Sequence, residues 1–500
     1  MAMGYRSEKT SQLQGLHAMS MLAQTLLGPN RYGRQTGHID IILTSISSEN
    51  ATLALLAKAV ENHKQLYGTG CTLLVNLVQR LAECILDLKA QNANMTGLTV
   101  GLNKALTIAL NTCQRMQINV NEWLEEMGTC DEMVILGRAL ISSCSEQQSA
   151  MITAVEVAKA LTTFYNLTYH IPGFVRMHSF VGPKKTWIER NLLIEIDTST
   201  KSYDHFCHPK QSSMIALIDG SASFSTELIQ ALRHLEVGCL ISSQEINSQL
   251  HDWCQEIDII CFATPQLHLI ASIFQLPIFS TIKALAKTTV LRSLNEPVVF
   301  QLYTSSTIHH KDDEKISFLR LTHGSIKHCS VVVQRPSLSL AQETVRSIEI
   351  CLARLHQAWH SRVVLPGGGA VFSACAVAIR HELPTDIFAG IFADALELVN
   401  LQLLLNQGSY DYLSAKCHLN NIMKNFENGM NTSDQYLETV FYGQTLTPLW
   451  TVSEQGLQKG RRFDCYKSTK DILRTSVRLV TMMAMINRSI INCNTANMTN

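Results

Sequence analysis

Apolar residues at both ends of the chain recur at helical spacing. The pattern predicts helices over residues 53–66, 72–88 and 99–116 in the first part of the chain. Helical spacing returns after about residue 340, where Ile348 and Leu352 share one face of a predicted helix. The two ends of the chain are therefore predicted to be mostly helical.

The middle of the chain has a different pattern, in which short apolar runs of strand length alternate with helical segments. A run at 237–242 precedes a helical segment at 245–254, and a run at 258–263 precedes one at 265–274. Because this order is typical of parallel strands joined by crossover helices, we predict a parallel sheet here. The pattern thus indicates an α/β insertion between two helical regions.

Two further apolar runs follow the predicted parallel sheet. Residues 316–322 and 328–334 are predicted to pair as a hairpin. Just behind them, Ser339 and Gln342 have the spacing of a capping box, which predicts the start of a long helix.

Amino-acid composition indicates what kind of macromolecule the chain binds. The chain has 500 residues, enough for about three domains. Lys plus Arg and Asp plus Glu are both 41, so the zero net charge argues against nucleic acid as the main partner. Only 16% of residues are charged, against about 25% in ordinary soluble proteins. This deficit suggests a surface that is covered by partner proteins.

Cysteine usage and hydropathy bear on location. The 15 cysteines show no repeated CxxC spacing, and no signal-peptide pattern is evident, so we expect a reducing, intracellular setting. The apolar run at 391–405 is interrupted by Asp394, Glu397 and Asn400, which predicts that it does not span a membrane.

The sequence offers little for catalysis or metal binding. The central segment has no GxSxG elbow, no GxGxxG motif and no evident nucleophile with its base. His205, Cys207 and His208 contain metal-binding atoms, but no second pair at zinc spacing accompanies them. We therefore predict no catalytic residue and no metal site.

A run of three glycines, Gly367 to Gly369, lies between two predicted helices. By itself it is consistent with a tight interhelical turn or with backbone donors that face an anion. In its context, Pro366 to Ala370 resembles the Pro-Gly-Gly-Gly-Ala signature of the group II (TCP-1/thermosome-type) chaperonins. Five more segments resemble that family in the same order: Leu26–Pro29, Gly68–Thr72, Val237–Ile278, Ser330–Trp359 and Phe463–Ile490.

The resemblance implies an α + α/β fold, a three-domain chaperonin subunit. It implies a helical equatorial domain from residues 1–117 and 363–500. It further implies a small intermediate domain from residues 118–185 and 301–362, and an α/β apical domain from residues 186–300.

Departures from the family concern its ATPase carboxylates. Thr69 stands where active members have an Asp that helps to hold metal and phosphates, and Ile350 stands where a second Asp orients the attacking water. An acid does remain in a third motif, at Glu49. Because phosphoryl transfer depends on a placed metal and water, the resemblance implies no useful ATP hydrolysis.

Nucleotide binding without hydrolysis stays open. ATP with Mg²⁺ is the cofactor that the family would imply, and glycine turns kept only for helix packing are an equal alternative. The residues that could line a nucleotide pocket are mostly glycines: Gly28, Pro29, Gly68, Thr69, Gly70, Thr72, Gly368 and Gly369.

Within the superfamily, the chain resembles the Bardet-Biedl syndrome chaperonin-like proteins. This resemblance implies a scaffold for assembly of the BBSome, the complex that carries membrane proteins to cilia. The implied partners are other members of this group, cytosolic chaperonin subunits and BBSome subunits, and the implied location is the cytoplasm and the centrosome or ciliary basal body. The alternative is an ATP-driven ring subunit that folds cytosolic clients.

Overall fold

The chain folds into two compact units. Unit 1 contains Met1–Val155 and Arg346–Asn500, and unit 2 contains Glu156–Val345. The division into five domain segments stays a prediction. The computed structural model describes residues 24, 51–90, 97–127, 132–140, 145–161, 175–196, 210–220, 225–257, 259–274, 276–280, 298–304, 317–322, 328–406, 411–430 and 463–485.

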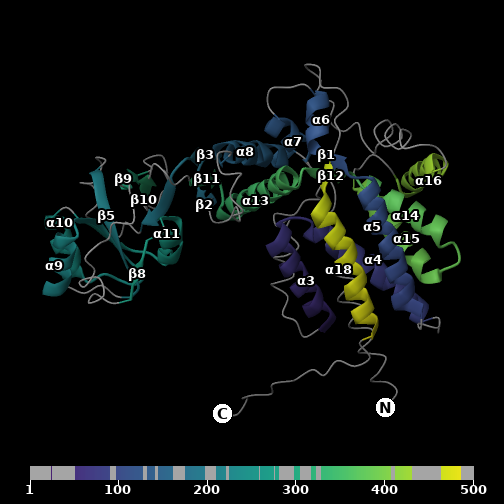
Figure 1. Ribbon diagram of the computed structural model, residues 1–500, viewed down its shortest axis with the longest axis horizontal. Coiled ribbons are helices and arrows are strands. Elements are labelled where there is room, and N and C mark those ends of the chain that lie inside the picture. Colours follow the sequence, from purple (N-terminus) through teal and green to yellow (C-terminus); the bar gives the residue numbers. More distant parts are fainter. Residues whose placement is uncertain are drawn as a thin grey trace, which may run out of the picture. The chain divides into compact units, whose positions relative to one another are not determined.

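Unit 1 is built mainly from helices, which confirms the prediction for the two ends of the chain (Figure 1). The helices with their bounds are α3 (Ala51–Tyr67), α4 (Cys71–Ala90), α5 (Leu98–Arg115), α6 (Val120–Met127), α7 (Glu132–Ala139), α14 (Ala370–Glu382), α15 (Ile387–Leu405), α16 (Tyr412–Met430) and α18 (Tyr466–Met485). Two more, α8 (Ser145–Leu161) and α13 (Leu338–Ser361), run across the boundary between the units.

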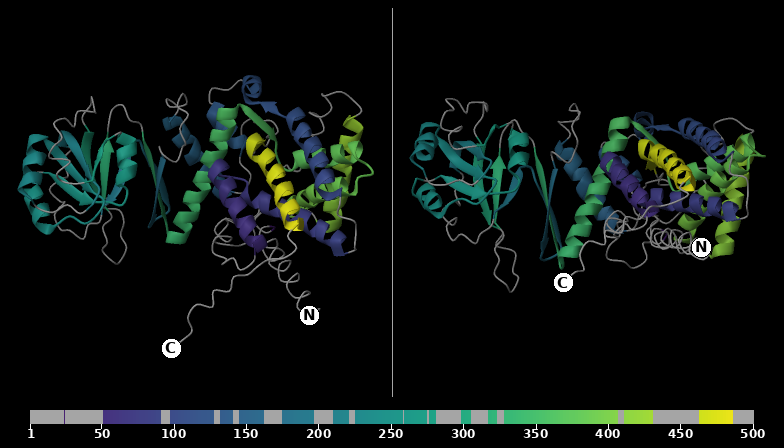
Figure 2. Two further views of the ribbon diagram at one scale, coloured as in Figure 1. Left: turned by 60° about the horizontal axis from the view of Figure 1, so that its bottom comes forward. Right: turned by 90° about the horizontal axis from the view of Figure 1, so that it is seen from below.

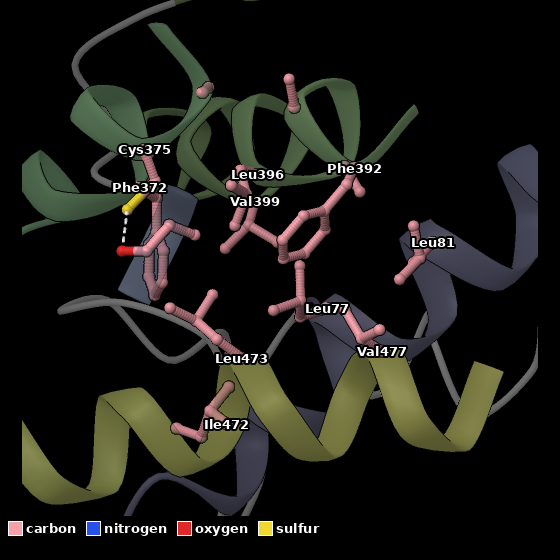
Figure 3. Packing of buried hydrophobic residues seen from close by; sticks show 14 of the residues in the cluster. Leu77, Leu81, Phe372, Cys375, Phe392, Leu396, Val399, Ile472, Leu473 and Val477 are labelled. Carbon is pink, nitrogen blue, oxygen red and sulfur yellow. Dashed lines mark hydrogen bonds between the residues drawn. The ribbon is translucent and has the colours of Figure 1, made fainter. Parts of the chain in front are cut away.

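One hydrophobic core joins helices from both ends of the chain. Leu77 of α4 and Phe392 of α15 are buried there together with Leu473 of α18 (Figure 3). In the same core, the Cys375 thiol of α14 donates to the carbonyl of Ala109 in α5 at 3.5 Å. Helices far apart in sequence therefore form one body, because each buries its apolar stripe against the others.

Helix α15 is the one described helix that is long and apolar enough to cross a membrane by length and composition alone. Within unit 1 it packs against α4, α5, α14 and α16. Of its most apolar window, 56% is buried inside the protein. Its hydrophobicity is thus used in the core of unit 1.

A small antiparallel sheet in unit 1 brings three distant segments together. Its strands are β1 (Ile118–Asn119), β12 (Val363–Pro366) and β13 (Phe463–Cys465), in the order β1-β12-β13. Leu365 of β12 lies opposite Asp464 of β13. Since β12 ends directly before Gly367, this sheet positions the start of the glycine run.

Unit 2 contains a seven-stranded mixed sheet of order β4-β10-β9-β5-β6-β7, with β8 beside β5. Strands β5, β6 and β7 are parallel, and α10 crosses from β6 to β7, which confirms the predicted parallel arrangement. The elements are β4 (Leu192–Ile196), β5 (Lys210–Ile218), α9 (Thr226–His234), β6 (Val237–Ser242), α10 (Ser248–Glu256), β7 (Ile260–Ala263), α11 (Leu267–Phe274), β8 (Ile278–Phe279), β9 (Val298–Thr304) and β10 (Ser317–Thr322).

Helices cover both faces of the parallel part of this sheet (Figure 2). Leu217 and Ile241 contribute to the core on the face covered by α11. Their neighbours Ala216 and Leu240 contribute to the core on the face covered by α9 and α10. Because successive strand residues point to opposite faces, both faces must be apolar, which explains the continuous apolar runs in the sequence.

The predicted hairpin is wrong. Strand β10 pairs with β4 and β9, whereas β11 (Cys329–Arg335) belongs to a separate three-stranded sheet. In that sheet β11 is parallel to β2 (Val175–Val181) and antiparallel to β3 (Lys185–Glu189). The apolar runs correctly indicated two strands, but the choice of strand partner is made by tertiary packing.

Two histidines are buried at the sheet of β2 and β11. His178 is 5% exposed and His328 is 4% exposed. Burial, with a further contribution from the positive charge of Arg176, lowers the pKa of His178 to about 3 and that of His328 to about 4. Both imidazoles are therefore neutral in the folded protein at neutral pH.

Candidate functional site

The first candidate turn connects α3 to α4. Gly68 and Gly70 have φ values of +65° and +86°, which L-residues with a side chain rarely adopt. The Gly68 amide donates to the carbonyl of Lys64 at 2.7 Å, and the Leu74 amide donates to the carbonyl of Gly70 at 3.0 Å. One helix therefore ends and the next begins within this turn.

Both glycines of this turn are packed tightly against neighbouring helices. A Cβ on Gly68 would lie 2.6 Å from the Cβ of Ala353 in α13. A Cβ on Gly70 would lie 2.8 Å from the Ser468 hydroxyl and 2.9 Å from Ile472, both in α18. The space beside each glycine is thus occupied by protein, so the positive φ values and the close packing account for both glycines without a ligand.

Between them, Thr69 is buried and is held by α13. The Nε of Arg354 donates to the Thr69 hydroxyl at 3.1 Å. One turn further along α13, the side-chain amide of Gln357 donates to the carbonyl of Tyr67 at 2.5 Å. The turn therefore lies directly against one face of α13.

Ile350 belongs to this same face of α13. It precedes Ala353 and Arg354 by three and four residues, the spacing that places helical side chains on one side. Its partly buried side chain stands where the family resemblance implies the Asp that orients water. An alkyl side chain can neither accept a proton nor orient a water by hydrogen bonding.

A buried hydrogen-bonded group supports the turn from its other side. His63 Nδ1 lies 2.8 Å from a carboxylate oxygen of Asp471, and His63 Nε2 lies 3.2 Å from the Ser468 hydroxyl. This resembles the geometry of an activated hydroxyl. His63 is only 1% exposed and Ser468 only 3% exposed, and Gly70 lies against both. Through these hydrogen bonds the group holds α3, the turn and α18 together.

Burial also affects Tyr67, the last residue of α3. Its ring lies 4.8 Å from the imidazole of His63, measured between centroids. Desolvation raises the pKa of Tyr67, and the nearby Asp471 carboxylate adds to this effect. The phenol is therefore uncharged at neutral pH.

The second candidate turn is the glycine run before α14. Gly368 and Gly369 have φ values of +69° and +86°. A Cβ on Gly369 would overlap the buried Asn400 of α15, whose side-chain amide donates to the Ser373 hydroxyl at 2.8 Å. Gly368, by contrast, is exposed, and a Cβ there would meet no atom within 4 Å in the described part of the chain, apart from its two neighbours in sequence.

Asp464 connects the surroundings of the two turns. It lies opposite Leu365, two residues before the glycine run. One of its carboxylate oxygens is 4.0 Å from Nη2 of Arg354, whose Nε contacts Thr69 in the first turn. The two turns therefore belong to one region of unit 1.

The structure brings most of the candidate residues into this region. Gly68, Thr69 and Gly70 lie in the turn between α3 and α4. Thr72 lies at the start of helix α4, where its carbonyl accepts a hydrogen bond from the side-chain amide of Asn76 at 2.8 Å. Their role in nucleotide binding stays a prediction. Three positions lie outside the described residues: Gly28, Pro29 and Glu49.

Sequence reasoning missed Arg354. Its signal was its position four residues after Ile350, which places both on one helical face. An arginine in a helix is common, however, and only the proximity of Thr69 gives this one its role.

The described residues around Thr69 do not fit a Mg²⁺ ion. Mg²⁺ prefers carboxylate, phosphate and water oxygens. Among the described residues, no group of three or more His, Cys, Asp or Glu side chains could hold a metal. The Thr69 hydroxyl already accepts from a guanidinium, which repels a divalent cation.

Comparison with known proteins agrees with this architecture. The TCP-1/cpn60 chaperonin family profile matches residues 34–492. The fold is similar to the crystal structure of a group III chaperonin in the open state, with a TM-score of 0.68 and 15% sequence identity over 97% of this chain and 99% of that chain. No curated protein sequence matches the chain. The chain belongs to the TCP-1/cpn60 chaperonin family and has the α + α/β, multi-domain fold of a chaperonin subunit.

Proposed function

We propose that this chain acts as a chaperonin-like subunit that binds and scaffolds other proteins without hydrolysing ATP. One observation carries the proposal. The guanidinium of Arg354 donates to Thr69, at the position where the family resemblance implies a carboxylate that holds metal. Cations that bridge the phosphates, together with a positioned water, are what phosphoryl transfer requires. The guanidinium of Arg354 cannot replace a metal ion that bridges the phosphates, and Ile350 cannot position the attacking water.

Turnover measurements test this part of the proposal. The purified chain is incubated with ATP, with Mg²⁺ present or chelated. We expect phosphate release at the background rate in both conditions. Turnover that falls when Mg²⁺ is chelated would favour an ATP-driven ring subunit. The open, exposed Gly368 is the observation that supports this alternative, because it leaves room for a ligand beside the second turn.

Within the family, we assign the chain to the Bardet-Biedl syndrome chaperonin-like proteins. Ala378–His381 and Phe463–Cys465 resemble the McKusick-Kaufman (Bardet-Biedl syndrome 6) protein. Thr69–Leu74 resembles the Bardet-Biedl syndrome 12 protein. The McKusick-Kaufman protein is the closer resemblance.

This assignment leads to a proposal for clients and location. The chain would hold BBSome subunits during their assembly, together with other members of the group and cytosolic chaperonin subunits. It would work in the cytoplasm, at the centrosome or ciliary basal body. The low share of charged residues, 16%, supports a surface that is covered by other proteins.

Affinity purification from ciliated cells, followed by mass spectrometry, tests the clients. We expect BBSome subunits and cytosolic chaperonin chains among the recovered proteins. Recovery of a complete ring together with unrelated newly made proteins would support the ATP-driven alternative. Recovery of neither set would contradict the proposed scaffold.

A further inference from the structure

We propose that Arg354 is a built-in cation that locks the Tyr67–Gly70 turn onto α13 and excludes a divalent metal from it. The inference deepens the proposed function, on which it rests, because it names what keeps the site inactive. In this proposal the position of the turn against α13 is fixed by the protein's own side chain and does not depend on a bound nucleotide.

The geometry of the guanidinium carries the inference. Its Nε donates to the Thr69 hydroxyl at 3.1 Å, and its Nη1 donates to the carbonyl of Leu140, just after α7, at 3.0 Å. Its Nη2 lies 4.0 Å from Asp464 in β13. One side chain therefore connects α13 to three segments that are far apart in the sequence.

Burial and charge make these contacts effective. The Arg354 side chain is only 17% exposed, so water screens its charge much less than at the surface. The planar guanidinium presents donors in fixed directions, which allows it to reach several acceptors at once. A lysine in its place would have a single, strongly hydrated ammonium group.

The same contacts oppose metal binding. Mg²⁺ needs oxygen ligands at about 2.0–2.1 Å and is usually bound through one or two carboxylates together with substrate phosphates. At this turn the Thr69 oxygen faces a positive charge, and the nearby Asp464 carboxylate already lies beside the same guanidinium. A divalent ion would therefore be repelled, with no unpaired carboxylate in the Arg354 contacts to compensate.

Packing of Gly68 against Ala353 is the competing explanation for the closed turn. If packing alone held it, loss of the guanidinium would leave the turn unchanged. Arg354→Met separates the two explanations, because it keeps an unbranched apolar stem and removes the charge and the hydrogen-bond donors of the guanidinium. Thr69→Val, which removes the acceptor and keeps the shape, provides a second, milder variant.

Amide hydrogen exchange without nucleotide measures the lock. We expect exchange at residues 68–74 to become about tenfold faster in Arg354→Met, as befits the loss of hydrogen bonds from a charged donor. Thr69→Val should show a smaller increase. The matched control is Arg380→Met, since Arg380 contacts Asp394 and Glu397 on α15 and does not contact the turn. Unchanged exchange in Arg354→Met, or an equal increase in the control, would overturn the inference.

Variants that add a carboxylate at position 69 and remove the guanidinium at position 354 test whether Arg354 excludes a metal ion. Thermal unfolding is followed with ADP, in Mg²⁺ or in EDTA, for the wild type, Thr69→Asp, Arg354→Met and the double variant. We expect a rise in Tm caused by Mg²⁺, of about 2–5 °C, only in the double variant, where a carboxylate is present and the guanidinium is absent. In Thr69→Asp alone, Arg354 should neutralise the new carboxylate. An equal rise in the wild type, or none in the double variant, would refute metal exclusion.

These experiments separate the inference from the proposed function. If the wild type hydrolyses ATP while Arg354→Met still speeds exchange at the turn, the proposed function fails and the lock stands. If exchange does not respond and the wild type remains inactive towards ATP, the lock fails and the proposed function stands.

Discussion

The two glycine turns of unit 1 share a backbone geometry and differ in what surrounds them. Gly68 and Gly368 have φ values of +65° and +69°, and Gly70 and Gly369 both have +86°. Yet Gly68 lies against Ala353 of α13, whereas Gly368 faces open space. A positive φ therefore explains why a glycine is present at each position. The neighbouring elements decide whether the space beside the glycine is filled by protein or left open for a ligand.

The largest effect is expected for Gly68→Ala. The left-handed backbone and the contact with Ala353 act together, so we predict a loss of about 2–5 kcal/mol in the free energy of unfolding. The contact cannot be relieved by a flexible side chain, because Ala353 ends at Cβ. Denaturant titration of the purified variant measures this. A loss below that of Gly368→Ala would contradict the difference between the two turns.

Lowering the pH should destabilise the sheet of β2 and β11 in unit 2 more than the turn between α3 and α4. The folded pKa values of His178 and His328, about 3 and about 4, lie below the unfolded value of 6.5, so the unfolded chain takes up protons first. The contribution of these two histidines to the free energy of unfolding is therefore fully present above about pH 6.5. It decreases as the pH falls towards 4, by about 1.4 kcal/mol per pH unit for each histidine.

Hydrogen exchange at pH 7 and pH 5.5 checks this result segment by segment. Strands β2 and β11 should lose protection at the lower pH, after correction for the intrinsic exchange rate. Replacement of both histidines by Gln should reduce the difference. An acid response that is larger at residues 68–74 than at β2 would count against the assignment to unit 2.

The second turn can be probed by relieving its closest contact, with the side chain of Asn400. Gly369→Ala should destabilise unit 1 because the new methyl group overlaps Asn400. Adding Asn400→Ala should recover part of that loss, with a coupling of about 1–2 kcal/mol in a double-mutant cycle. Additive effects would mean that Asn400 does not limit the space at Gly369.

The smallest effect is expected for Gly368→Ala. Among the described residues beyond its chain neighbours, no atom lies within 4 Å of the added methyl group, so we expect only the left-handed backbone to oppose it, at about 1–2 kcal/mol. Thermal unfolding beside Gly68→Ala gives the comparison directly. A loss as large as that of Gly68→Ala would show that the second turn is also packed.

The local pattern predicted elements better than it predicted partners. The expected helix over 99–116 is α5, Leu98–Arg115, and the expected strand over 237–242 is β6, Val237–Ser242. The cap of α13 is shifted by two residues, because the Ser337 hydroxyl, not that of Ser339, accepts from the amide of Leu340. Such small differences arise because several serines near a helix start offer similar local signals.

The candidate site shows the same division. The glycines of both turns were identifiable because only glycine readily tolerates their backbone angles. The contact between Arg354 and Thr69 was not, since 285 positions separate them in the sequence. The distinction between a packed turn and an open one depended on Ala353, Ser468 and Asn400, which come from three other helices.

The sequence by itself determined the helical ends, the α/β insertion, the positions of both glycine turns and the absence of an acid at positions 69 and 350. These are local properties, set by side-chain periodicity and by backbone sterics. Only the tertiary structure decided that β10 and β11 enter different sheets and that a guanidinium meets Thr69. Such choices depend on which distant segments pack together, because a side chain acquires a role only from the groups that folding brings within bonding distance.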